Sequence, residues 1–468
     1  MKSQKLIIAM ATAGSLMLLS GCDDGDDVNV DLGSNNPTPT NPGTGNVVAP
    51  TNCPVGTGSI ASISGQATAV CDLPASIDAN ATMSSDFTYF MDDFVVVGNG
   101  DGRVTTQGGN LVVGGDNEPL INATLTIEPG TQIFADNDAT LKITRGSNII
   151  AEGTADAPIT FSGRDEGFDG SQEWGGVVIS GFGIDNSDTD PAGGFNIDAE
   201  ARLGFYGGDD NTDDSGIFKF VRIAEGGFPV VEDEEINGLT LLGVGSGTTI
   251  ENIQVDGNAD DGIEFFGGAA NVKNMVLSNM IDDSIDYASG YQGNIQFVIV
   301  SRPNADSGKG IEADNKNGDP TLTPRARPTL ANITFVAGDD TEDAGAQWRR
   351  GAGGFLHNSI IAGGQVCFDV DTQGAEITST ELALNNVLFN CAADTAGDAE
   401  DGGSDFAAPL VAAGGAMKGN PQLDEDFVPA SADAQLGAPV DFATVPVTGG
   451  INTADSNFLV QTDYLGAI

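Results

Sequence analysis

The sequence predicts an all-β protein: a single-stranded, right-handed parallel β-helix (a solenoid) that follows an N-terminal lipoprotein signal and a flexible linker. Two observations lead to this fold, and a third bears on its partners. Glycine contributes 65 of the 468 residues, which favours a chain with many tight turns. Short Val- and Ile-rich runs recur with a nearly constant period, as in solenoid proteins. The formal net charge of −50 excludes nucleic acid as a partner, because such a chain repels phosphate.

Residues 1–21 are predicted to be a signal peptide. Lys2 and Lys5 precede an apolar stretch that is too short to span a bilayer comfortably. The stretch ends in Leu19-Ser20-Gly21-Cys22, which resembles the bacterial lipobox and implies lipidation of Cys22. The alternative is an ordinary secretory signal with an accidental cysteine. A lipid anchor would make the membrane the first expected partner.

Residues 22–52 are predicted to be a lipidated, flexible linker, because they are rich in Pro, Asn, Gly and Thr and lack an apolar period. The acidic run 23–27 resembles a surface-export signal of some bacteria and an inner-membrane retention signal of others. We expect an outer-membrane protein that faces outward. The periplasmic face of the inner membrane is the alternative.

Three further segments follow: an N-terminal cap region (53–94), the β-helix (95–425) and a C-terminal segment that packs on the helix (426–468). Four cysteines remain after Cys22. An even number in an oxidising compartment predicts two disulfides, most simply Cys53–Cys71 and Cys367–Cys391, although spacing leaves other pairings open. A single histidine and the lack of any CxxC pair argue against zinc.

The repeat is clearest over residues 249–300. The run 249–255 is echoed at 271–277 and again at 294–300, and a second family of short strands lies between these runs. One register position holds asparagine in four repeats, which predicts an internal asparagine ladder that Phe297 interrupts. Its members are Asn252, Asn274, Asn332 and Asn358. The alternative is a β-sandwich whose spacing arises by chance.

Several ordered motifs carry a family resemblance. They include Leu125-Thr126-Ile127-Glu128-Pro129-Gly130-Thr131, Glu173-Trp174-Gly175-Gly176, Phe205-Tyr206-Gly207-Gly208 and Asp260-Asp261-Gly262-Ile263-Glu264-Phe265-Phe266-Gly267-Gly268. Together they resemble a mostly uncharacterised family of bacterial β-helix lipoproteins from marine bacteria and Bacteroidetes. The likeness covers about residues 95–395. It implies the fold and the cell-envelope location, but no activity.

Stacking the second strand family places acidic residues of successive repeats in one column. Strand alternation turns the isoleucines beside them inward and the carboxylates outward, onto a flat face. Oxygen ligands without histidine or cysteine point to Ca²⁺ as a cofactor. The predicted metal ligands are Asp260, Asp261, Glu264, Asp282, Asp283, Asp286 and Glu312. The alternative is that these residues form turns in an already acidic protein.

An enzymatic hypothesis places Lys309 or Arg302 as a general base beside the column, as in calcium-dependent polysaccharide lyases and epimerases. In that hypothesis arginines of the insertions grip an acidic sugar, the candidates being Arg325, Arg327, Arg349 and Arg350. The alternative is that all of these cations are ordinary countercharges. Trp348 is expected in a loop, where with Arg349 it would bind a ligand.

The glycine-rich run 243–247 lacks the helix that a phosphate-binding loop needs, so nucleotide binding is excluded. The sequence therefore predicts a lipid-anchored surface module that binds glycans or an outer-membrane partner, or has a structural role, stabilised by calcium. One alternative is a calcium-dependent lyase or epimerase that acts on acidic polysaccharide. Another is an accessory lipoprotein of an outer-membrane receptor.

Overall fold

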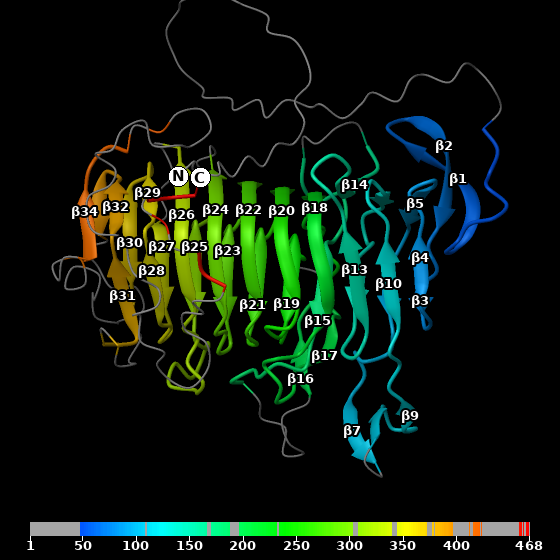
Figure 1. Ribbon diagram of the computed structural model, residues 1–468, viewed down its shortest axis with the longest axis horizontal. Coiled ribbons are helices and arrows are strands. Elements are labelled where there is room, and N and C mark those ends of the chain that lie inside the picture. The colour runs from blue at the N-terminus through cyan, green and yellow to red at the C-terminus, as the bar shows by residue number, and fades with distance from the viewer. Residues whose placement is uncertain are drawn as a thin grey trace, which may run out of the picture.

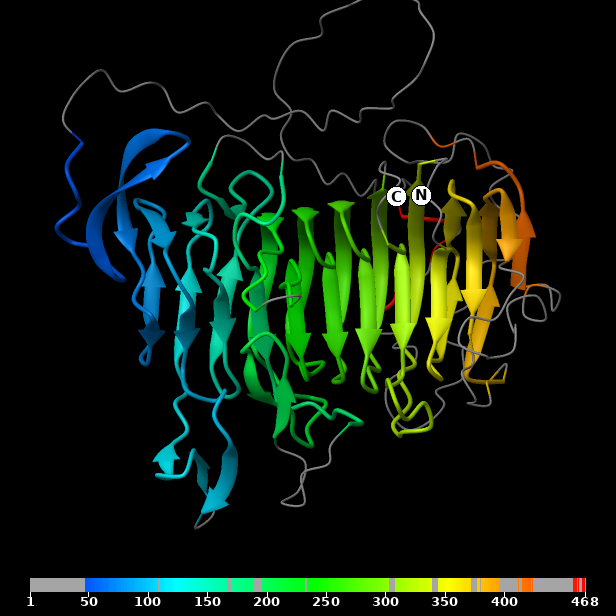
Figure 2. The same cartoon turned by 180° about the vertical axis from the view of Figure 1, so that it is seen from behind.

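Parallel pairing between strands one repeat apart generates the fold (Figures 1 and 2). Each repeat, here called a coil, contributes a first, a second and a third strand, and equivalent strands of successive coils lie side by side. The predicted all-β parallel β-helix is confirmed. The computed structural model describes residues 47–107, 110–165, 170–187, 196–231, 234–302, 308–338, 344–371, 377–378, 380–395, 411, 415–421, 423, 458–460, 462 and 465–467.

Residues 1–46 lie outside the described residues, and with them the predicted signal peptide, Cys22 and most of the linker. The same is true of most of the segment 426–468. Within the described part of the chain, no helix has the length and apolar character needed to cross a membrane.

The first strands of the coils form one ladder of parallel pairs. They are β4 (Ala81–Met83), β10 (Thr124–Ile127), β13 (Asn148–Glu152), β18 (Gly216–Gly226), β20 (Thr249–Asn258), β22 (Asn271–Met280), β24 (Asn294–Arg302), β26 (Thr329–Ala337), β28 (Gly354–His357) and β31 (Leu382–Asn385). In β18, β20, β22, β24 and β26 the first and second strands form one continuous element, with a bend at one residue between them.

The second strands form a ladder beside the first. Apart from the long strands already given, they are β2 (Gln66–Asp72), β5 (Thr88–Met91), β11 (Gln132–Ala135), β14 (Ile159–Gly163), β29 (Ile360–Ala362), β32 (Val387–Asn390) and β34 (Ala416–Lys418). β1 (Thr57–Ile63) pairs antiparallel with β2, and this hairpin lies at one end of the stack (Figure 1).

The third strands form a separate 11-stranded parallel sheet. They are β3 (Ser76–Ile77), β6 (Val95–Val97), β12 (Leu141–Ile143), β15 (Val177–Ser180), β19 (Leu239–Leu242), β21 (Ile263–Phe266), β23 (Ile285–Ala288), β25 (Ile311–Asp314), β27 (Ala344–Arg349), β30 (Val366–Val370) and β33 (Ala393–Thr395). Branched side chains at equivalent positions of this sheet stack on one another and line the apolar interior, as Ile263, Ile285 and Ile311 do.

The bend between first and second strands is made by residues in the left-handed backbone conformation. Asn252, Asn274, Asn332 and Asn358 have φ between +49° and +61°, and Phe297 has φ +62°. Asparagine tolerates this conformation better than most residues with a side chain. The amide of Asn274 donates to the side-chain oxygen of Asn252 at 3.2 Å, so the predicted ladder exists there. Phe297 interrupts it, as expected.

The ladder does not lie in the apolar interior, which corrects the prediction. Asn252 and Asn274 are half-buried at the bend, between the buried residues Ile250 and Ile253 and their equivalents in the next coil. Asn332 is buried because the C-terminal segment covers it: its amide donates to Thr462 at 3.1 Å. A left-handed residue ends one strand and begins the next, so the side chain turns away from the core.

Both disulfides have the pairing that the sequence favoured. Cys53 joins Cys71 across 18 residues and thereby ties the chain before β1 to β2. Cys367 of β30 joins Cys391, which follows β32, across 24 residues. The two covalent links therefore lie toward opposite ends of the described β-helix, where fewer neighbouring coils hold the chain in place.

Long insertions leave the coil at one corner, between a third strand and the next first strand. The insertion 98–123 carries β7 (Val104–Gln107), β8 (Asn110–Val113) and β9 (Glu118–Pro119), and 181–215 carries β16 (Ile197–Ala199) and β17 (Gly204–Tyr206). Both project from the same edge of the stack (Figures 1 and 2). Further insertions occupy 315–328 and 371–381.

Replacing Asn274 with alanine should destabilise the protein by about 1–3 kcal/mol, because the substitution removes a ladder hydrogen bond. Alanine would also have to adopt φ +61°, a backbone conformation that it tolerates less well than asparagine does. Asn274→Gly is the control: glycine adopts this φ freely, so it should cost less than alanine. Urea denaturation measures both. An unchanged unfolding curve for Asn274→Ala would contradict the ladder's contribution.

Candidate functional site

Three predicted carboxylates occupy one position of the 11-stranded sheet. Glu264 of β21 pairs with Asp286 of β23, and Asp286 pairs with Glu312 of β25. Their side chains point away from the interior, because the neighbouring isoleucines fill it. Adjacent strands are about 4.8 Å apart, so these three carboxylates are close neighbours.

A second row lies at the turn that precedes these strands. The backbone N–H of Asp261 donates to the side chain of Asn237 at 3.2 Å, and that of Asp283 donates to Asp261 at 2.9 Å. The N–H of Lys309 donates to Asp283 in the same way. Asp261 and Asp283 therefore shape the turns, and each has a second carboxylate oxygen that these bonds do not use.

Most of these carboxylates are buried or half-buried, which corrects the expectation of an exposed flat face, and only Asp282 among the predicted ligands is exposed. Glu264 is 8% exposed, Asp261 is 5% exposed, and Glu312 is 6% exposed. The insertion 181–215 folds back over the sheet here: its residues Ala201, Leu203 and Tyr206 pack in a small apolar cluster with Leu242 at the end of β19. The cover comes from a segment far away in the sequence.

Two groups of these carboxylates have oxygens that converge within 4.8 Å of one another. One consists of Asp260, Asp261 and Asp282, and the other of Asp261, Glu264 and Asp286. Asp261 belongs to both. The Oδ1 atom of Asp286 is shielded from solvent and accepts no hydrogen bond from the described residues. Such an atom fits a cation ligand, because a buried oxygen without a partner is costly.

The clustered carboxyls favour the neutral state when no cation is present. Burial, and then the nearby charge of Asp282, raises the pKa of Asp260 to about 7. Burial together with neighbouring carboxylates also raises the pKa values of Asp261, Glu264 and Asp286 well above their ordinary range. The group must therefore take up protons or a cation at neutral pH.

Basic residues neutralise the other end of the column. The ammonium of Lys309 lies 3.0 Å from Glu312. Arg349 also contacts Glu312, and its Nε lies 2.9 Å from Asp314, which Arg350 contacts as well. These contacts engage Glu312, so it is a poor additional ligand. They also agree with the alternative that Lys309 and Arg349 are countercharges.

Two more candidate residues are buried. Arg302 is 1% exposed and donates to the backbone carbonyl of Asp282 at 3.2 Å, so it is not open to a substrate. Trp348 lies in β27 and not in a loop. It is fully buried next to Ala313, and its ring lies 5.3 Å from that of Phe368. The small side chain of Ala313 leaves room for the indole.

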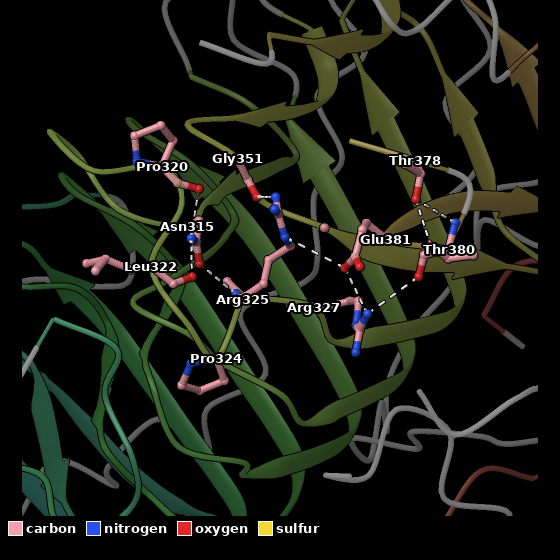
Figure 3. A network of polar contacts seen from close by, with 12 residues as sticks. Asn315, Pro320, Leu322, Pro324, Arg325, Arg327, Gly351, Thr378, Thr380 and Glu381 are labelled. Carbon is pink, nitrogen blue, oxygen red and sulfur yellow. Dashed lines mark hydrogen bonds and ion pairs between the residues drawn. The ribbon is translucent and has the colours of Figure 1, made fainter. Parts of the chain in front are cut away.

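Arg325 and Arg327 hold two insertions together (Figure 3). Arg327 lies 2.8 Å from the carboxylate of Glu381 and Arg325 lies 3.7 Å from it. Arg325 also donates to the carbonyl of Gly351. In the same network the amide of Asn315 fixes the loop 315–328 through the carbonyls of Pro320 and Leu322. Both arginines are therefore structural countercharges rather than a grip for an acidic sugar.

A pocket of about 350 Å³ opens beside the acidic column. Its floor includes Leu242 and Phe266, which end the strands β19 and β21 and pair with one another. Sequence reasoning missed this pocket, because its wall comes from the insertion 181–215. It also missed a third acidic group, formed by Asp165, Glu173 and Glu225, whose members lie in unrelated parts of the sequence.

The comparisons with known proteins concern the β-helix itself. A family model described as a pectate-lyase-like β-helix domain matches residues 107–420, which is more than half of the chain. No curated protein matches the chain, and no solved structure does. The match spans the coils that carry the acidic column and the pocket.

The raised pKa values predict how stability depends on pH in chelator, where no cation is bound. The folded protein binds more protons than the unfolded chain between about pH 4, the ordinary aspartate range, and about pH 7. Its free energy of unfolding should therefore fall as the pH rises through this window. Thermal unfolding at several pH values measures the slope, and Asp260→Asn should reduce it. A chelated protein whose melting temperature rises steadily from pH 4 to 7 would contradict the assignment.

Proposed function

Since the chain belongs to the pectate-lyase-like β-helix family, we propose that it is a lipid-anchored module of the cell envelope that binds glycans and is stabilised by Ca²⁺. The observation that carries the proposal is the group of Asp261, Glu264 and the half-buried Asp286 on the outer face of the 11-stranded sheet, next to the pocket. A buried cluster of like charges is stable only if protons or a cation neutralise it.

Calcium is the cation that these donors suit best. The ligands are oxygens only, and carboxylates supply the charge that a hard divalent ion requires. Asn237 donates to Glu264 at 2.7 Å and so orients this carboxylate. A bound Ca²⁺ would neutralise the cluster and join the turns before β21 and β23. It would thus stabilise the face on which the pocket opens.

The contacts around the column favour a binding module over a lyase or epimerase. In those enzymes a basic residue must reach the substrate's proton. Lys309 is paired with Glu312 and Arg302 is buried, so neither candidate base is open to a substrate. The family's fold alone does not assign an activity, because one architecture serves many functions.

The lipid anchor rests on the sequence alone. Cys22 follows a short apolar stretch and precedes an acidic, proline-rich linker. We place the protein in the outer membrane, facing outward, with an outer-membrane receptor as a further possible partner of the module.

Calcium should raise the melting temperature of the wild-type protein by several degrees relative to chelator, and magnesium should raise it less. Asp286→Asn should abolish most of this shift, since it weakens a charged ligand with little change in volume. Asp116→Asn, in the exposed turn between β8 and β9, is the matched control and should keep the full shift. A calcium shift of equal size in wild type and Asp286→Asn would contradict the proposed site.

Cys22→Ala should release the protein from the membrane fraction, because the thiol that carries the lipid is lost. Fractionation of cells that express either form, followed by immunoblotting, measures the distribution. Protein that stays in the membrane fraction after the substitution would show that another element anchors it.

A further inference from the structure

The pocket beside the acidic column owes its shape to the lengths of successive turns. Between the long insertions 181–215 and 315–328, the corner is closed by the short turns 243–248, 267–270 and 289–293. The two insertions therefore extend from this corner on either side of three coils that have only short turns. The pocket of about 350 Å³ lies there, at the small end of the range of ligand sites.

The floor of the pocket offers an apolar platform. Phe266 is half-buried, and its ring packs beside Leu242 and Tyr206. Ile197 of β16 adds a further apolar contact from the insertion. A partly exposed aromatic ring on a rigid strand suits the apolar C–H face of a sugar ring.

The wall is held in one conformation before any ligand arrives. The hydroxyl of Tyr206 donates to the carboxylate of Asp185 at 2.5 Å, and the backbone N–H of Ser187 donates to the same carboxylate at 2.7 Å. Glu234 accepts from the backbone N–H of Ala201 at 2.8 Å and fixes the insertion on its other side. A wall ordered in advance lowers the entropy cost of binding.

Lys316 is a cation that remains available to a ligand. It is half-buried, lines the pocket, and makes no ion pair or hydrogen bond with any residue that the structure describes. Lys219, by contrast, lies 3.3 Å from Glu251, and Lys309 lies 3.0 Å from Glu312. The charge of Lys316 acts on Asp185 and Glu200, where it opposes the rise in pKa that burial causes, but it forms an ion pair with neither.

The charge balance of the pocket indicates the class of ligand. Asp198 and Glu200 line it on the side of the insertion, opposite the single cation Lys316, and Glu264 lies nearby on the sheet. This surplus of negative charge disfavours an acidic sugar. The hydroxyls of a neutral sugar can donate to the carboxylates and accept from the ammonium.

We propose that this pocket binds a neutral hexosyl residue of a glycan, with Phe266 under the ring, Lys316 donating to its oxygens, and Glu200 and Asp198 accepting from its hydroxyls. The inference rests on the proposed glycan-binding function and specifies its ligand. None of these four residues belongs to the groups whose carboxylates converge, although the charge of Glu200 acts on Glu264.

Saturation-transfer NMR and calorimetry on the full chain, purified in detergent, test the proposal. The probes are neutral tetramers of glucose, mannose and galactose, and charged tetramers of galacturonic acid and glucosamine. At least one neutral tetramer should bind more tightly than both charged ones. Lys316→Met should weaken its binding at least tenfold, and Phe266→Leu several-fold, while the matched control Lys219→Met should bind like wild type.

Several results would overturn the assignment: no neutral tetramer binds, galacturonate binds best, or Lys316→Met binds like wild type. Melting temperatures of the variants show that each is folded. The calcium shift measured on the same samples separates the two proposals. A full calcium shift without sugar binding refutes the pocket alone, and sugar binding without a calcium shift refutes the metal site alone.

Discussion

The register between successive coils is the constraint on which the rest of this molecule depends. Parallel pairing places each residue directly beside its equivalent one repeat later. Side chains of the same kind at one position therefore lie next to one another along the stack, whether they are apolar or charged. Stacked Ile263, Ile285 and Ile311 build the core in this way. The left-handed residues at the bend keep the register where first and second strands meet, and the side-chain bond between Asn252 and Asn274 reinforces it.

The same register makes stacked charges a liability. At the position of Glu312 the liability is resolved by Lys309 and Arg349. At Asp286 and Glu264, one and two coils away from Glu312, no described basic side chain forms an ion pair with the carboxylates. Burial under the insertion 181–215 increases the cost. These carboxylates without ion pairs lie beside a pocket whose floor includes the aromatic ring of Phe266. That juxtaposition is why we assign the face a binding role.

The sequence predicted the features that follow from a constant period. It placed Glu264, Asp286 and Glu312 in one column, because their repeats are nearly equal in length. It failed for Trp348, because the residues before β27 break the period and hide the alternation that buries the indole. It also failed for the burial of the column and for the pocket, since both depend on where the insertion 181–215 packs. Periodicity carries no information about that contact.

A crystal structure grown in calcium, with anomalous scattering to identify the ion, tests the central claim most directly. The account predicts one Ca²⁺ bound by oxygens of Asp261, Glu264 and Asp286, at the distances of about 2.3–2.6 Å that calcium requires. A structure in which these carboxyls bond to one another through shared protons, with no ion between them in saturating calcium, would contradict it.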